Sequence, residues 1–285
     1  MEKLQTDSSY LWTSESFNKD LSQTYTFYSF IEDDRFSCAI IEEDSSELLA
    51  LQEIEGVNLL SNSSNLEGVF KKNTFLGLDY ETSRLILQHQ STSILPSIGT
   101  KNELIKLAQL ELPEVEDSNI WNVEEIQNTN LSATAFIDKA LLQQLEKRIP
   151  NVDVHLVACS FIEESSKHSK FKDKHQLNWL ISKSTSYLCA HLKGELLIFN
   201  QFETSSTEDL LYYTLNTIEL LALDPINCEV NISGNTKNIL LNEKVLSSYL
   251  HHFNIVSDIQ GLKANLISDS AITRNYTMLS QFLCG

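Results

Sequence analysis

The sequence predicts an α/β fold in which one unit of strands and helices occurs twice. Residues 47–55 (ELLALQEIE) closely match residues 195–203 (ELLIFNQFE), far along the chain. Just upstream, residues 36–39 (FSCA) resemble residues 187–190 (YLCA), and a three-residue difference in the intervening turn would bring both matches into register. The matches keep their order and their strand–turn–strand setting, which favours a duplicated domain. A chain of 285 residues is also long enough for two cores.

The first half is predicted to open with an antiparallel three-stranded meander. The first 22 residues read as a tail or irregular arm, which Trp12 and Phe17 could anchor on the body. Runs rich in aromatic and β-branched residues predict strands over 25–31, 36–41 and 47–54. Apolar periodicity and stop signals then predict helices and strands in alternation. The predicted helices are 59–71, 101–110, 132–148 and 161–170, and the predicted strands are 74–79, 84–89, 120–126 and 152–158.

The second half is predicted to repeat this order. Its meander is expected over 176–181, 186–192 and 195–202, and a helix follows. Ser205 and Glu208 fit a capping box, in which the two side chains bond free amide groups of the first helical turn. Residues 228–233 then predict a strand, 245–253 a helix and 255–259 an extended segment.

Three meandering strands followed by alternating helices and strands are typical of a ribonuclease-H-like unit. Two such units in tandem form the actin-like ATPase fold, with two mixed five-stranded sheets flanked by helices around a central cleft. We therefore predict an N-terminal arm over 1–22, a first ribonuclease-H-like domain over 23–172 and a second over 173–285.

Three motifs in the second half carry a resemblance to a known family. They are residues 196–202 (LLIFNQF), 207–213 (TEDLLYY) and 223–225 (LDP). Together they are similar to the central signature of an uncharacterised bacterial family, found chiefly in Bacteroidetes and assigned to the actin-like ATPase fold. The resemblance extends more loosely over 24–260, and it implies a fold without an established activity. The chain is also distantly similar to actin-like scaffold proteins of pilus and type II secretion machines.

Composition narrows the classes of partner and compartment. The chain has 21 basic and 39 acidic residues and a formal charge of −18. Nucleic acids are bound mainly through Lys and Arg, so we expect no nucleic-acid partner. The five scattered cysteines form no CxxC pair, the start of the chain is polar, and no segment is apolar for the roughly 20 residues that span a bilayer. These features predict a cytoplasmic protein without direct membrane insertion.

A nucleotide site would lie at two hairpin turns that face the cleft. Phosphate-binding turns of actin-like ATPases typically combine Gly, which lets backbone amides approach phosphate, with an Asp that holds Mg²⁺ through water. The first turn, which contains Asp33, and the second, which contains Lys183, Ser184 and Thr185, both lack glycine. Gly234 follows a late strand, where an adenosine loop is expected. These five residues are the candidate nucleotide or anion site, and the alternative is that both turns are plain solvated hairpins.

We predict a non-catalytic, actin-like scaffold or interaction protein with an unidentified protein partner. The alternative is a nucleotide-binding switch, ATPase or phosphotransferase that uses the interdomain cleft. No cofactor is expected, ATP with Mg²⁺ being the alternative, and no catalytic or metal-binding motif is recognisable. His155 and His191 lie in predicted strands and are expected to be hydrogen-bonded structural residues.

Overall fold

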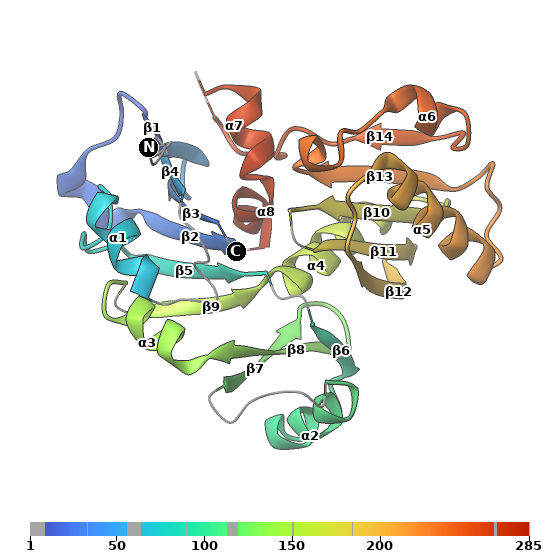
Figure 1. Ribbon diagram of the computed structural model, residues 1–285, viewed down its shortest axis with the longest axis horizontal. Coiled ribbons are helices and arrows are strands. Elements are labelled where there is room, and N and C mark those ends of the chain that lie inside the picture. The colour runs from blue at the N-terminus through green and yellow to red at the C-terminus, as the bar shows by residue number, and fades with distance from the viewer. Residues whose placement is uncertain are drawn as a thin grey trace, which may run out of the picture.

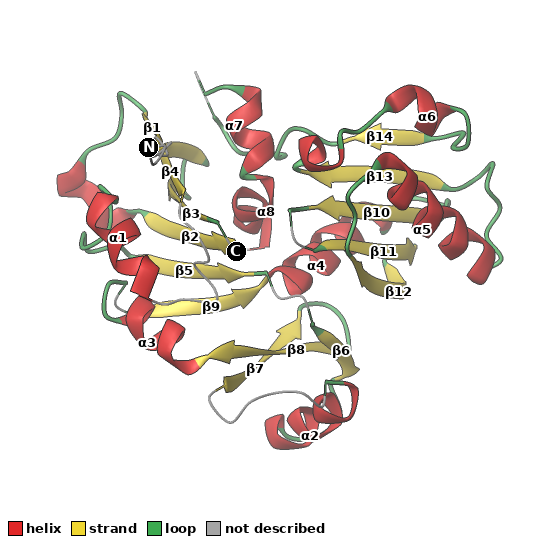
Figure 2. Ribbon diagram, viewed as in Figure 1, coloured by secondary structure: helices red, strands yellow, loops and turns green. Residues whose placement is uncertain are grey.

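The computed structural model describes residues 9–32, 34–55, 64–88, 91–112, 119–149, 151–183, 185–264 and 267–284. Two large β-sheets lie side by side, with helices between them and on their outer sides (Figure 1). A small third sheet lies below the first one in this view, and Figure 2 shows the helices that flank all three.

The first half forms a six-stranded sheet in the order β1-β4-β3-β2-β5-β9. Its strands are β1 (Ser9–Thr13), β2 (Thr26–Glu32), β3 (Arg35–Glu42), β4 (Glu47–Glu55), β5 (Thr82–Leu87) and β9 (Val152–Leu156). The meander β2–β3–β4 is antiparallel, whereas β5 pairs in parallel with both β2 and β9. The associated helices are α1 (Ser64–Lys72), α3 (Lys139–Glu146), α4 (Val157–Ser169) and the 3-10 helix Lys19–Thr24.

The second half forms a five-stranded sheet in the equivalent order β12-β11-β10-β13-β14. Its strands are β10 (Gln176–Ile181), β11 (Ser186–Leu192), β12 (Glu195–Phe202), β13 (Glu229–Gly234) and β14 (Phe253–Ile255). Its helices are α5 (Thr207–Leu220), α6 (Glu243–Ser247), α7 (Asp269–Arg274), α8 (Tyr276–Leu279) and the 3-10 helices Thr236–Ile239 and Ser280–Cys284. The predicted duplication is therefore present in the topology, since both sheets combine an antiparallel meander with parallel strands.

A shared irregularity fixes the equivalent residues of the two meanders. The register shifts between Ile40 and Ile41 in β3 and between Ala190 and His191 in β11. Cys38 is therefore equivalent to Leu188, and the predicted equivalence with Cys189 is wrong by one residue. Because strand side chains alternate between faces, this shift places the two cysteines on opposite faces of their sheets.

Three apolar clusters organise the core. One lies on the outer face of the first sheet and includes Phe27, Leu85 and residues of α1 and α3. Another lies on the outer face of the second sheet beneath α5. The third contains Phe30 from the first sheet, Tyr187 from the second and residues of α8. This shared core joins the inner faces of the sheets, that is, the faces toward the other half.

The first half also contains a unit that the sequence analysis did not predict. Strands β6 (Ser93–Pro96), β8 (Leu131–Asp138) and β7 (Asn119–Ile126) form a three-stranded antiparallel sheet, and helix α2 (Lys101–Glu111) packs on it. The helix predicted over 132–148 is wrong in its first part, where β8 pairs with β7. Helix α3 begins only after Asp138, whose side chain accepts a hydrogen bond from the Leu141 amide.

Other elements differ from their predictions at specific points. Residues 9–13 of the predicted irregular arm pair with β4, which makes the first sheet six-stranded instead of five-stranded. The strand predicted over 74–79 is wrong, because these residues form turns and the strand begins at Thr82. Helix α4 begins at Val157, earlier than predicted, and α6 ends at Ser247, well before 253. The helix cap is one residue later than predicted, with Ser206 bonded to the Asp209 amide.

Some predictions lie partly outside the described residues, including the start of the helix predicted over 59–71 and residues 1–8 of the arm. Among the residues that are described, no helix is both long enough and apolar enough to cross a membrane. The domain boundaries at residues 22 and 172 stay predictions.

Candidate functional site between the two halves

The two predicted phosphate-binding turns meet across the boundary between the halves. Asp34 follows β2 in the first turn, and Lys183 follows β10 in the second. The ammonium group of Lys183 forms an ion pair with the Asp34 carboxylate, and both side chains are about half exposed. Asp33 and Ser184 lie outside the described residues. The structure thus brings Lys183 to the first turn, where its charge is engaged by a carboxylate.

A buried amide ties the two halves together beneath this ion pair. Gln88 follows β5 in the first half, and its Nε2 group donates hydrogen bonds to Ser182 Oγ, at 2.5 Å, and to the Thr185 carbonyl oxygen. The Ser182 hydroxyl in turn donates to the same carbonyl at 2.6 Å. The predicted site residue Thr185 is therefore buried, and its carbonyl is used in holding the two halves together.

Charged residues of the first turn are also engaged with the C-terminal helices. Arg35 pairs with Glu32 and donates to the Arg274 carbonyl oxygen at 3.0 Å. Arg274 pairs at 3.1 Å with Glu53, which also accepts a hydrogen bond from Asn275. Burial raises the pKa of Glu32, although the adjacent Arg35 opposes that rise. This network links β2, β3 and β4 to the junction of α7 and α8.

Gly234 has a structural reason to be glycine. It ends β13 opposite Ile181 of β10, and its φ of +86° favours a residue without a side chain. A Cβ atom at this position would lie 2.2 Å from the Ile181 carbonyl oxygen, closer than any real contact. The close pairing of β10 and β13 therefore accounts for this glycine without a nucleotide.

The described part of the candidate site fits a nucleotide triphosphate poorly. A triphosphate needs space between the two turns, and here the Lys183–Asp34 ion pair joins them. Gln88 also bonds the second turn to the end of β5. The three carboxylates around the first turn, Glu32, Asp34 and Glu53, are paired with Arg35, Lys183 and Arg274. In this described part of the chain, the basic side chains that could hold a phosphate are therefore already engaged. Within the described ranges, no cluster of three or more His, Cys, Asp and Glu side chains could hold a metal ion.

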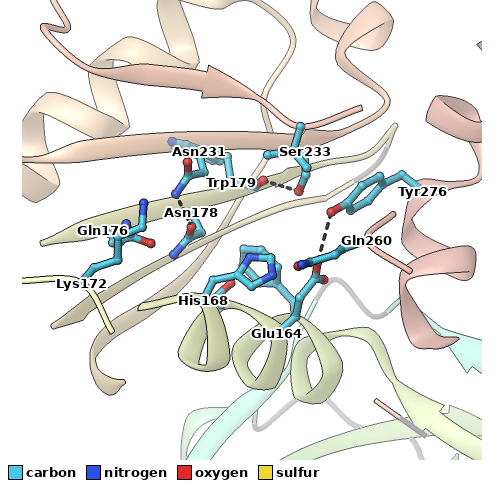
Figure 3. A pocket seen from close by; sticks show the side chains of 13 residues that line it. Glu164, His168, Lys172, Gln176, Asn178, Trp179, Asn231, Ser233, Gln260 and Tyr276 are labelled. Atoms are coloured by element: carbon cyan, nitrogen blue, oxygen red, sulfur yellow. Dashed lines mark hydrogen bonds between the residues drawn. The ribbon is translucent and has the colours of Figure 1, made fainter. Parts of the chain in front are cut away.

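A separate hollow of about 310 Å³ lies on the inner face of the second sheet (Figure 3). Its floor is formed by β10 and β13, and its walls come from one face of α4, from the segment after β14 and from Tyr276 of α8. Except for Ser233, which precedes Gly234, it shares no residue with the candidate nucleotide site or its flanking positions. This hollow was not predicted from the sequence.

Three asparagines at matched positions of the parallel strands form what we call the amide ladder: Asn178, Asn231 and Asn254. Asn254 donates to Asn231 Oδ1 at 3.1 Å, and Asn231 donates to Asn178 Oδ1 at 2.9 Å. Glu229 anchors the outer end by accepting from Asn254 at 2.8 Å. The same carboxylate accepts from Gln176 and forms an ion pair with Lys172, so its charge is matched.

On the opposite wall, Glu164 is a buried carboxyl group. Tyr276 Oη donates to its Oε1 atom at 3.1 Å, and the labelled side chains of Figure 3 show this contact beside Gln260. Burial raises the pKa of Glu164 to about 7, and the Tyr276 hydrogen bond and the charge of Lys167 only partly oppose this. The neutral and ionised forms are therefore both populated near neutral pH.

The two strand histidines behave differently. His155 Nδ1 contacts Glu124 Oε1 at 2.9 Å, which confirms its predicted role as a hydrogen-bonded structural residue. His191 is fully buried, and neither ring nitrogen has a hydrogen-bond partner in the structure, so the same prediction is wrong for His191. Burial lowers the pKa of His191 to about 4, so the ring is neutral at pH 7.

A sequence signal for the hollow does exist, although it is weak. Strands in the parallel part of a sheet are normally buried on both faces, and such strands are normally apolar throughout. Residues 176, 178, 229, 231, 233 and 254 instead place polar side chains at alternate positions of three strands. Such alternation predicts one polar face, but it does not reveal that α4 and α8 leave a space above it.

Comparison with known proteins places this chain by family and by fold. The sequence profile of the family described as "Protein of unknown function (DUF3822)" matches residues 14–253, which is most of the chain. The chain belongs to this family. This confirms the resemblance to an uncharacterised family that the motifs of the second half indicated. None of the curated proteins matches the chain.

Among solved structures, this chain resembles a Bacteroides thetaiotaomicron protein that is described as having an actin-like ATPase fold and unknown function. The TM-score is 0.79 at 20% identity, over 94% of this chain and 99% of that one. It also resembles a chain of the PilM-PilN type IV pilus biogenesis complex, with a TM-score of 0.61 at 9% identity, over 92% and 98% of the two chains. At these identities the likeness shows the fold alone, and it confirms the predicted actin-like ATPase fold.

Proposed function

We propose that this protein is a non-catalytic, cytoplasmic actin-like scaffold that binds another protein and has no nucleotide cycle. The observation that carries the proposal is the buried bridge from Gln88, at the end of β5 in the first half, to Ser182 and Thr185 of the second turn, which fixes this turn against the first half where a phosphate would bind. Nucleotide-driven switches in general need two arrangements of the halves for which the ligand has different affinities. A bridge of buried hydrogen bonds favours a single arrangement.

Two further features support protein binding over catalysis. The fold is shared with a protein found in a pilus biogenesis complex, so an actin-like body can serve in a protein assembly. Large apolar side chains are exposed on and beside α2 of the three-stranded unit, including Ile98, Leu107 and Leu110. Exposed apolar groups that gather in one region are typical of protein interaction sites.

The test is thermal unfolding of the full chain at fixed salt, alone and with millimolar Mg·ATP, Mg·ADP or inorganic phosphate. A ligand at about 100 times its dissociation constant adds roughly 2.7 kcal/mol of stability, which amounts to a shift of several degrees. We expect no shift with any of the three, and no ATP hydrolysis.

The matched variants are Lys183→Ala and Lys237→Ala, the second of which removes a Lys in the 3-10 helix after β13. A shift in the native protein that disappears in Lys183→Ala and persists in Lys237→Ala would contradict the proposal and establish the nucleotide switch. Gly234 variants are unsuitable here, because a side chain at this position would disturb the β10–β13 pair whether or not a nucleotide binds.

A further inference from the structure

The direction of hydrogen bonding in the amide ladder leaves one donor without a proper acceptor. Each asparagine donates toward β10, so the ladder ends at the Nδ2 group of Asn178. That group has no oxygen or nitrogen acceptor among the described residues, and it lies beside the thiol of Cys189, a weak acceptor. Asn178 is only 7% exposed, and Figure 3 shows its side chain pointing from β10 toward α4 across the hollow.

An unmet buried donor is costly, so an isolated one calls for an explanation. The ladder also strengthens this donor, because Asn178 Oδ1 accepts from Asn231, and an amide whose oxygen accepts a hydrogen bond becomes a stronger donor at its nitrogen. A group bound in the hollow that offers a carbonyl oxygen would complete the ladder.

The opposite wall offers the complementary partners. Tyr276 occupies Oε1 of Glu164, which leaves the second oxygen of this carboxyl group toward the hollow. Gln260 lies beside it and supplies both a donor and an acceptor. A neutral carboxyl group can donate to a carbonyl oxygen while accepting from an amide N–H, and the pKa of Glu164 near 7 makes that form available.

The charged side chains around the hollow disfavour an anionic ligand. Glu164 and Glu229 line or anchor the hollow, and the nearby Lys172 contacts both oxygens of Glu229, at 3.2 and 3.0 Å. A phosphate or carboxylate ligand would meet these acidic groups while the Lys172 ammonium is already paired with Glu229, so His168 is the basic side chain that the described lining leaves to face it. The volume of about 310 Å³ lies at the lower end of the range for small-molecule sites.

We propose that this hollow binds a small uncharged molecule that carries a carboxamide group. The carboxamide oxygen accepts from Asn178 Nδ2, and its N–H group donates to Glu164 or Gln260. The site is independent of the proposed scaffold function, since it lies apart from the two turns and from the Gln88 bridge.

The test is NMR titration of the full-length, ¹⁵N-labelled protein with acetamide, nicotinamide and nicotinate. Nicotinamide and nicotinate have the same ring and differ in whether they carry an amide or an anion. We expect acetamide and nicotinamide to move the side-chain amide signals of Asn178 and Asn231 in a saturable way, and nicotinate to act at least ten-fold more weakly. No movement of the Asn178 signal with either amide, or an equal effect of nicotinate, would overturn the proposal.

Variants locate the binding. Asn178→Ala should weaken nicotinamide binding at least ten-fold, whereas Asn227→Ala, which removes an exposed asparagine after α5, should leave it unchanged. Should Asn178→Ala fail to fold, Gln260→Ala in the exposed turn after β14 serves instead, with an expected loss of several-fold. Binding that survives both Asn178→Ala and Gln260→Ala would contradict the assigned site.

Discussion

The first sheet carries, across β2, β5 and β9, the positions that the amide ladder occupies across β10, β13 and β14. In the first sheet this row is Tyr28, Arg84 and Asp153. The Arg84 guanidinium lies over the Tyr28 ring, 5.5 Å from its centre, and donates to its hydroxyl at 3.1 Å. Tyr28 in turn donates to Glu43 at 3.0 Å. Long side chains thus occupy the space above one sheet, while two of the three short amides, Asn178 and Asn231, line a hollow above the other.

The difference teaches that duplicated topology conserves backbone register more strongly than side-chain chemistry. Both meanders keep their register shift at equivalent positions, because the backbone hydrogen bonds must be satisfied in either half. The residues on the inner faces are free to change as long as their polar groups find partners. One half has become a packed contact in this way, and the other a polar cavity.

The largest loss of stability is expected at the ends of β5 and β13, where the two halves carry different residues. Leu87 ends β5, and Gly234 is its equivalent in β13. Gly234→Val should cost more than about 3 kcal/mol, because its Cβ would overlap the Ile181 carbonyl oxygen. Gly77→Ala is the control, since its φ is also positive but nothing lies within 4 Å. Urea denaturation should show a loss of only about 1 kcal/mol there, and equal losses would contradict the steric explanation.

Glu164 of α4, which lines the hollow above the second sheet, gives the protein a pH dependence that its neutralisation should remove. The folded protein holds a proton on Glu164 up to pH 7, whereas the unfolded chain releases it near its ordinary pKa of 4.5. Stability from this group is therefore full below pH 4.5 and is lost as the pH rises to 7. At pH 8, the free energy of unfolding of Glu164→Gln should exceed that of the native protein by up to about 3 kcal/mol. Glu67→Gln on the exposed face of α1 is the control, and a pH-independent gain in Glu164→Gln would refute this account.

His191 occupies the position of Ile41 in the first sheet, and its burial creates the opposite pH dependence. Its folded pKa of about 4 lies below the ordinary value of 6.5, so stability is full above pH 6.5 and is lost as the pH falls toward 4. His191→Leu should remove this loss, which amounts to about 2 kcal/mol at pH 5. Denaturation curves at pH 7.5 and pH 5 measure it. An unchanged pH 5 deficit in the variant would show that His191 is not the group responsible.

A pair of variants compares the two inner-face rows directly. Asn231→Ala removes the middle of the amide ladder and leaves the buried oxygen of Asn178 without its donor, whereas the exposed Asn254 keeps its bond to Glu229, so we expect a loss of about 2 kcal/mol. Tyr28→Phe removes one hydroxyl while the ring stays in place under Arg84, so about 1 kcal/mol is expected. Chemical denaturation measures both losses. A larger loss of unfolding free energy for Tyr28→Phe than for Asn231→Ala would contradict the expected order.

The smallest effect is expected at the exposed ion pair that joins the two turns. Lys183→Ala and Asp34→Ala should each cost less than about 1 kcal/mol, because solvent and salt screen half-exposed charges. A double-mutant cycle at low and at high salt isolates the pair. A coupling energy that is large and insensitive to salt would mean that this ion pair, and not the Gln88 bridge alone, holds the two halves together.

Periodicity was reliable where local pattern and tertiary role agreed. The strands over 176–181, 186–192 and 195–202 match their predictions because each run is bounded by clear turns, and the first two are also almost fully buried. It failed over residues 132–138, where an apolar helical spacing was overridden by pairing with β7. The arm also needed a partner to become regular, since β1 exists only as a neighbour of β4.

The candidate nucleotide site was also predicted only in part, in its location but not in its contacts. Their location at facing turns followed from the order of the strands, and the ion pair from Lys183 to the first turn agrees with it. That Gln88 would bond the second turn to the first half could not be predicted from the sequence, because this residue is distant in sequence from both partners. The amide ladder was missed for a related reason, since its register depends on parallel pairing between separated strands.

The sequence by itself determined the duplicated actin-like fold, because alternating burial and turn signals are local properties that repeat in each half. Only the tertiary structure decided what lies between the halves. Whether the turns are bonded together, and whether side chains fill the space above a sheet, depends on contacts among segments far apart in the chain. Such contacts are set by how α4 and α8 pack between the sheets, and no local pattern records that packing.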